Sequence, residues 1–232
     1  TAKYSGVVNA VYCGDKAEIW EYIFAEHGLE TVIAFFILFA GIVTVIFSIA
    51  LGVVYRTKFD MEYLGWCMIM AAGWMVGESK LRQVLVPNAT VLATLCFVMI
   101  MLGPLPIIYY IDSMQSGRHQ KLFWIAEAAA IVNFAVCTIL HLSGAKDYIE
   151  TLPIAHVILA VTLVLILGTV FYDMYHGYIT QNRFMVVGLL IAVVSVVVES
   201  ISAYFVISIS GIFMGIGMIV LLFFSLVRTI RN

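Results

Sequence analysis

Seven long apolar runs constrain this chain more than any other feature of its sequence. A helix that crosses a lipid bilayer needs about 20 predominantly apolar residues. The segments between the runs carry charges and turn formers, and the least distinct boundary lies near residue 206, where Ala203–Ser208 is still largely apolar. The pattern predicts an all-α, polytopic membrane protein, a bundle of seven transmembrane helices at residues 29–55, 61–82, 89–112, 122–142, 153–175, 184–205 and 207–228.

The composition supports a membrane setting. Hydrophobic residues make up 63% of the chain and charged residues 11%, whereas soluble domains average about 45–50% and about 25%. A soluble fold of this length could not hydrate such a surface. The net charge of −2 gives no indication of nucleic-acid binding, and membrane lipids are the expected surroundings.

The distribution of Lys and Arg predicts how the helices are oriented. Basic residues in short loops favour the cytoplasmic side. One side of the predicted bundle holds seven of them and the other holds five. The richer side has Arg56, Lys58, Arg118, Lys121, Arg183, Arg228 and Arg231, and the poorer side has Lys3, Lys16, Lys80, Arg82 and Lys146. We therefore expect the N-terminus outside and the C-terminus in the cytoplasm.

The two ends of the chain predict links to further domains. Residues 1–28 lack the apolar core of a signal peptide, and Tyr4–Cys13 is rich in Val and Tyr like a short strand, followed by an acidic helix start at Asp15. This region is either the end of an extracellular domain or a tethered tail. Residues 29–228 form the transmembrane domain. No Gly or Pro stops the last helix, so residues 229–232 are expected to begin a cytoplasmic signalling helix.

Ionisable residues inside the apolar runs are the main candidates for function. Each costs about 2.5–3.5 kcal/mol at a helix centre and is a functional hypothesis by default. The predicted topology places four of them, Glu78, His141, His156 and Glu199, in the outer half of the membrane on four helices. Glu127 and Asp173 lie near the opposite end, where Arg118 and Arg183 make structural ion pairs the expected role.

Helical spacing indicates a shared pocket in the outer half. Trp74, Glu78 and Arg82 fall at i, i+4 and i+8, which places them on one helix face, and the same spacing recurs in the fourth and sixth runs. The alternative is a structural network in which Arg82, Lys80 or the histidines tie the carboxylates between helices. The expected ligand-binding residues are Trp74, Glu78, Arg82, Asn133, His141, His156, Ser195 and Glu199.

Other patterns concern packing and chemistry. Gly103-Pro104-Leu105-Pro106 should bend the third helix, and Gly211 with Gly215 forms a GxxxG face for a homodimer or for a helix of the same chain. No lysine follows Lys146, which argues against a retinal protein, and no HxxxH or GxSG motif indicates a hydrolase. Two histidines and two glutamates could hold a metal, but isolated histidines are poorly specific. We expect no catalytic residue, metal or cofactor.

Two stretches of the sequence resemble a known family. They are Leu64-Gly65-Trp66 through Trp74 to Glu78–Gln83 and Pro87-Asn88, and Leu102–Pro106 through Tyr110 to Gln115, Gly117 and Arg118. With a likeness over about residues 10–230, the chain resembles the membrane sensor region that precedes GGDEF diguanylate cyclase domains in Gram-positive gut anaerobes, akin to bacterial seven-transmembrane receptors with diverse intracellular signalling modules.

The resemblance implies a bacterial plasma-membrane protein with an extracellular ligand-binding domain upstream and a cyclase downstream that makes cyclic di-GMP from two GTP. The chain itself has no GGDEF motif. We therefore expect a non-enzymatic sensory domain that binds a small-molecule or lipid signal, works as a homodimer and relays the signal to the cytoplasm. The alternatives are a small transporter and a passive, dimerising membrane anchor.

Overall fold

The computed structural model describes residues 13–56, 60–79, 81–82, 88–178, 183–205 and 211–231. The expected strand lies outside these residues, apart from Cys13 at its end. Within the described part the chain is helical throughout. Its helices are α1 (Lys16–Tyr55), α2 (Met61–Glu78), α4 (Ala89–Leu102), α5 (Pro104–Met114), α6 (Gln120–Leu142), α7 (Tyr148–Tyr175), α8 (Arg183–Phe205) and α9 (Ile212–Arg231).

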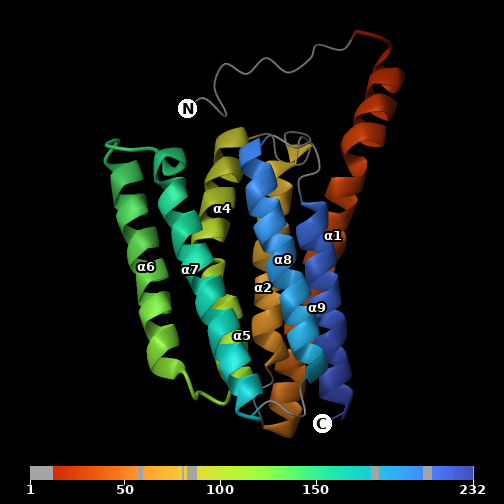
Figure 1. The fold of residues 1–232 in the computed structure, drawn as a ribbon. Coiled ribbons are helices and arrows are strands. Elements are labelled where there is room, and N and C mark those ends of the chain that lie inside the picture. The colour runs from red at the N-terminus through yellow and green to blue at the C-terminus, as the bar shows by residue number, and fades with distance from the viewer. Residues whose placement is uncertain are drawn as a thin grey trace.

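The helices run up and down in alternation, as Figure 1 shows, with α4 and α5 following each other along one path. Six spans among the described residues are long and apolar enough to cross a membrane: Lys16–Tyr55, Thr90–Met114, Gln120–Leu142, Tyr148–Tyr175, Met185–Ser202 and Ile212–Thr229. Large apolar side chains are exposed along them, including Phe39, Val54 and Val164. The protein is therefore a polytopic helical membrane protein.

Several helix boundaries differ from the expected apolar runs, and two of them matter for the site. The helix start expected at Asp15 is confirmed, because α1 begins at Lys16, but this helix continues without a break into the first apolar run. The expected domain boundary at residue 28 therefore falls inside a continuous helix of 40 residues that projects beyond the bundle (Figure 1). The second helix ends at Glu78, not at residue 82. Ser79 leaves the helix with ψ 139°, and its hydroxyl oxygen accepts the N–H of Leu81 at 3.2 Å, which stabilises the turn.

The expected interruption of the third apolar run is confirmed at Gly103. This residue keeps helical angles, φ −53° and ψ −34°, and Pro104 begins α5. A proline at the first position of a helix needs no donor there, because that N–H has no partner within the helix. The break places the end of α4 and the start of α5 near the middle of the bundle.

Small residues let α1 and α2 pack closely. A Cβ on Gly41 would lie 3.0 Å from the carbonyl oxygen of Gly65, and a Cβ on Gly65 would lie 2.6 Å from Val45. Such contacts allow dispersion forces to act between helices that have no hydrophobic drive to associate in lipid. α2 therefore lies against α1 and also contacts α4, α5 and α9.

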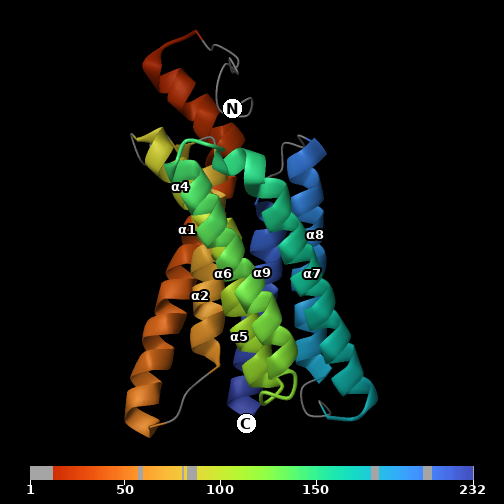
Figure 2. The same ribbon diagram turned by 90° about the vertical axis from the view of Figure 1, so that its left-hand side faces the viewer.

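The glycines of the GxxxG pattern face helices of the same chain. A Cβ on Gly215 would lie 2.7 Å from Ile33 on α1. Gly211 has φ +90°, which favours glycine, and it lies against Met75 of α2. This placement matches the intramolecular alternative for Gly211 and Gly215. α9 also packs along α8, as Figures 1 and 2 show from two sides.

Candidate functional site

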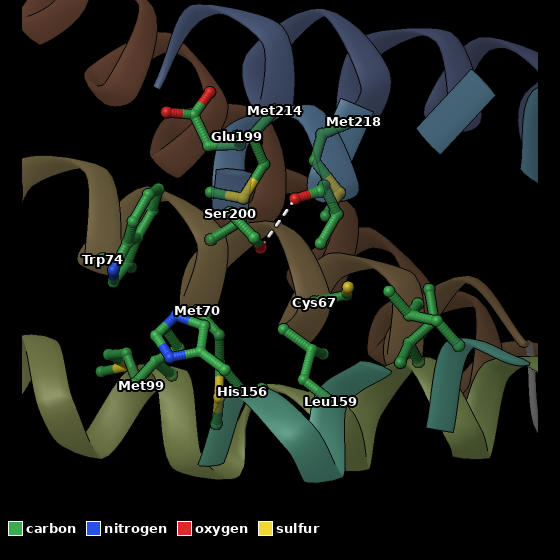
Figure 3. A pocket seen from close by; sticks show the side chains of 16 residues that line it. Cys67, Met70, Trp74, Met99, His156, Leu159, Glu199, Ser200, Met214 and Met218 are labelled. Carbon is green, nitrogen blue, oxygen red and sulfur yellow. Dashed lines mark hydrogen bonds between the residues drawn. The ribbon is translucent and has the colours of Figure 1, made fainter. Parts of the chain in front are cut away.

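One cavity lies in the centre of the bundle, between α2, α4, α5, α7, α8 and α9. Its volume is about 110 Å³. Its walls are mostly hydrocarbon and sulfur, with few polar atoms. The residues labelled in Figure 3 are Cys67, Met70, Trp74, Met99, His156, Leu159, Glu199, Ser200, Met214 and Met218.

Three of the eight expected ligand-binding residues line this cavity: Trp74, His156 and Glu199. His156 comes from the upper part of α7, and its Nδ1 donates to the carbonyl oxygen of Leu152 at 3.0 Å. Figure 3 shows its ring near Trp74 and Met70. The structure therefore brings these three residues, which come from three helices, to one cavity.

Glu199 is a helix-capping residue. Only 2% of it is exposed, and its Oε1 accepts the backbone N–H of Gly211 just before α9 begins. The first N–H groups of a helix have no partner within it, and a carboxylate at this end is stabilised by the helix dipole. Glu199 therefore joins α8 to the start of α9 through a backbone N–H.

The predicted column of Trp74, Glu78 and Arg82 is wrong, because the helix ends at Glu78. Arg82 lies beyond that end, and its Nη1 donates back to the carbonyl oxygen of Gly77 at 3.2 Å. Glu78 is directed to α4, where its Oε1 accepts the S–H of Cys96 at 3.7 Å. Glu78 and Arg82 are not among the residues that line the cavity.

Asn133 and His141 belong to another part of the bundle. The thiol of Cys137 lies 3.5 Å from Asn133 Oδ1, and Cys137 is buried in a separate apolar cluster of α4, α6 and α7. His141 stacks on Tyr148 with ring centroids 4.2 Å apart, and its Nδ1 lies 3.6 Å from the exposed carboxylate of Asp147. The prediction that these two residues share the pocket with Glu199 is wrong.

Ser195 is also outside the cavity. Its hydroxyl donates to the carbonyl oxygen of Ile191 in its own helix at 2.8 Å, and its side chain packs where a Cβ on Gly217 would lie 2.7 Å away. Equal depth in the membrane did not decide which residues meet, because helix rotation decides which way each side chain points.

The sequence interpretation missed the sulfur-bearing wall. Cys67, Met70, Met99, Met214 and Met218 line the cavity from α2, α4 and α9. Four of the chain's 11 methionines are in this set. Methionines in an apolar run have no distinguishing spacing, although their number in the sequence could have indicated a methionine-lined wall.

At the opposite end, Asp173 forms the expected structural ion pair. Its carboxylate is fully buried, with Arg118 Nη1 at 2.9 Å and His119 Nε2 at 3.0 Å. The Arg118 guanidinium also lies 3.9 Å from the ring centroid of Tyr178. Glu127 has Tyr109 as a hydrogen-bond partner, whereas the side chain of its expected partner, Arg183, is outside the described atoms.

A second polar group at this end links three helices. Asp60, just before α2, accepts a hydrogen bond from Ser113 of α5, and its Oδ2 lies 3.4 Å from Arg228 Nη2 of α9. The buried hydroxyl of Tyr110 donates to Ser225 of α9 at 3.0 Å. We call Asp60, Tyr110, Ser113, Ser225 and Arg228 the C-end cluster, because it lies at the same end of the bundle as the C-terminus (Figure 1).

Comparison with protein-family models, curated proteins and solved structures gives no match for this chain. In the described part of the chain, no group of three or more His, Cys, Asp or Glu side chains is arranged to hold a metal ion. The cavity is therefore interpreted from its own geometry.

The cap on α9 predicts how substitutions of Glu199 behave. Glu199→Leu removes the oxygen that accepts the Gly211 N–H, and leaving a buried donor without a partner costs about 1–3 kcal/mol. Glu199→Gln keeps an accepting oxygen and should lose less. Thermal unfolding of the purified protein, followed by circular dichroism, measures the difference.

The control for this comparison is Glu21→Leu, since Glu21 is an exposed carboxylate beyond the first turn of α1. A Glu199→Leu variant as stable as the Glu21→Leu variant would contradict the capping role. A Gln variant as unstable as the Leu variant would show that the charge, not the accepting oxygen, is required.

Proposed function

We propose that this chain is a seven-helix transmembrane sensory domain that binds a signal molecule in the central cavity and relays its presence to a cytoplasmic output domain. α2 is counted as the seventh spanning helix. It has only 18 residues, but it runs through the bundle between α1 and α4 and continues the up-and-down alternation (Figure 1). The output domain in this proposal is a GGDEF diguanylate cyclase, following the sequence resemblance.

The observation that carries the proposal is that two helices join the cavity to the C-end cluster. α2 lines the cavity with Trp74, and Asp60 directly precedes its first residue. α9 lines the cavity with Met214 and Met218 and carries Arg228 near its other end. Because a helix is a rigid element, a displacement of α2 or α9 at the cavity can change the distance between Asp60 and Arg228.

The ion pair is suited to a reversible change. The side chains of Asp60 and Arg228 are 28% and 19% exposed, so both keep some access to water. Breaking a fully buried pair costs about 3–5 kcal/mol, and partial access to water lowers that cost because water can solvate the separated charges. The relay requires two arrangements of the helices, one with the ion pair closed and one with it open. A ligand shifts the equilibrium between them only by the difference in its affinity for the two arrangements.

The other polar groups fit this proposal better than a transporter. A transporter needs a polar path through the bundle, and Asp173 is an intramembrane carboxylate that could lie on such a path. Its carboxylate is held by Arg118 and His119, so it has a structural role at the end of the bundle. The cavity itself presents mostly apolar side chains.

The proposal includes an orientation in the bacterial plasma membrane, with the N-terminus outside and the C-terminus in the cytoplasm. Gly117 and Gly144 lie in turns at opposite ends of the bundle, and both have φ +71°. Reporter enzymes fused after each residue should show Gly117 in the cytoplasm and Gly144 outside. The reverse result would place the C-end cluster outside and contradict a cytoplasmic relay.

The relay is tested by joining a diguanylate cyclase domain to Asn232 and measuring cyclic di-GMP in cells. Arg228→Gln and Asp60→Asn each remove one charge of the pair, so both should change the basal output in the same direction. The exchanged pair, Asp60→Arg with Arg228→Asp, should return the output toward the original level. Lys121→Gln is the matched control, because Lys121 is an exposed cation at the same end of the bundle.

Protein amounts in the membrane are measured in parallel, so that a loss of folding is not read as a loss of signal. Basal output that is equal in all four variants, at equal protein amounts, would contradict the relay. It would favour the alternative of a passive membrane anchor.

A further inference from the structure

Each polar side chain labelled in the cavity wall makes at least one hydrogen bond within the protein. Glu199 accepts the Gly211 N–H, and the Ser200 hydroxyl donates to the carbonyl oxygen of Val196 at 2.8 Å. His156 Nδ1 donates to the carbonyl oxygen of Leu152. Figure 3 shows the Glu199 carboxylate directed away from Cys67 and Leu159. The His156 and Ser200 hydrogen bonds lie within their own helices, and the Glu199 hydrogen bond joins α8 to the start of α9.

The remaining wall is apolar and adaptable. Met70, Met99, Met214 and Met218 contribute thioethers from α2, α4 and α9, and Trp74 adds an aromatic surface. Methionine has three rotatable bonds and a polarisable sulfur, which favours contacts with aromatic rings and with irregular apolar shapes. The wall can adjust to an apolar guest without breaking a hydrogen bond.

The size of the cavity limits the guest. Its volume of about 110 Å³ is about a quarter below that of an engineered apolar cavity in another protein, about 150 Å³, which binds benzene or xenon. This cavity differs in being partly open to its surroundings. A charged group would have to leave water for a wall that offers it little compensation, which is strongly unfavourable. Size and wall chemistry therefore select the same kind of guest.

We infer that the cavity binds an uncharged, apolar group of the size of one aromatic ring or a few methylene units. This inference rests on the proposed function, because it names the chemical class of ligand for the same cavity. The group has two possible sources: a small hydrophobic molecule dissolved in the bilayer, or the end of a lipid acyl chain. Both present the same chemistry to the methionines.

Trp74 provides a direct probe of occupancy, because it lines the cavity and bromine quenches tryptophan fluorescence at contact. The substitutions Trp20→Phe, Trp66→Phe and Trp124→Phe leave Trp74 as the single tryptophan. The full chain is placed in lipid nanodiscs and titrated with bromobenzene. We expect quenching that saturates and that is reversed by competing toluene. 4-Bromobenzenesulfonate, which carries a negative charge and has no cationic partner among the residues that line the cavity, should give no saturating component.

Filling the cavity supplies the specificity test. Ala71→Phe on α2 and Leu159→Phe on α7 each place a ring in the cavity, and at least one should fold. Each folded variant should weaken the saturating component by about tenfold or more, a factor that corresponds to about 1.4 kcal/mol. Val161→Phe is the matched control, because Val161 is an exposed residue of the same helix as Leu159.

Nanodiscs made with brominated acyl chains separate the two sources. Strong quenching of Trp74 by these lipids alone, removed by Ala71→Phe or Leu159→Phe, identifies a lipid chain as the guest. Quenching only by bromobenzene identifies a small molecule. Three results would overturn the inference. They are no saturating quenching by bromobenzene or by the brominated lipids, saturating quenching by the charged compound alone, and quenching that is equal in the original protein and in the Ala71→Phe and Leu159→Phe variants.

The binding measurements need no output domain, so a negative binding result can be distinguished from a negative result in the cyclic di-GMP test of the relay. A cavity that binds no apolar probe, together with output that still responds to the Asp60 and Arg228 substitutions, would reject the ligand class and leave the relay standing. Binding without any response of the output would reject the relay and leave the ligand class standing.

Discussion

Hydrocarbon offers no hydrogen bonds, so a polar group placed between membrane helices is stabilised only by partners inside the protein. The Glu199 carboxylate accepts the N–H of Gly211 at the start of α9, and the buried Asp173 carboxylate is held by Arg118 and His119. These contacts fix the helix ends. They also leave the middle of the bundle to apolar side chains, which is why the central cavity has walls of hydrocarbon and sulfur.

The sequence predicted the helices and one polar contact well, and the cavity poorly. Apolar runs locate spanning helices because length and composition decide whether a segment can enter a bilayer. The contact between Asp173 and Arg118 was predictable, since an intramembrane charge needs a partner at its own depth. Depth alone could not tell that Glu78, His141 and Glu199 point to three different neighbours. That outcome depends on the rotation of each helix and on where α2 ends, which only the packed structure defines.

The methionine-lined centre and the partly exposed ion pair of the C-end cluster together make a relay physically reasonable. Methionine side chains around the cavity can repack for a guest at little cost, whereas α2 and α9 are held at the C-end cluster by Asp60, Ser113 and Arg228. Closely packed helices tend to shift between discrete arrangements because an interior at crystal-like density does not deform continuously. A guest that favours one arrangement at the cavity would therefore change the distance between the two helices at the C-end cluster.

The most direct measurement of this coupling is the distance between spin labels on α2 and α9. Glu62→Cys and Thr229→Cys place the labels near the C-end cluster, with Cys13→Ser removing the exposed native thiol. Double electron–electron resonance is recorded in nanodiscs with and without saturating bromobenzene, and again in an Ala71→Phe background. We predict that bromobenzene shifts the distance distribution and that the Ala71→Phe variant no longer responds to it. An unchanged distribution in protein whose Trp74 fluorescence shows that the cavity is occupied would contradict the account.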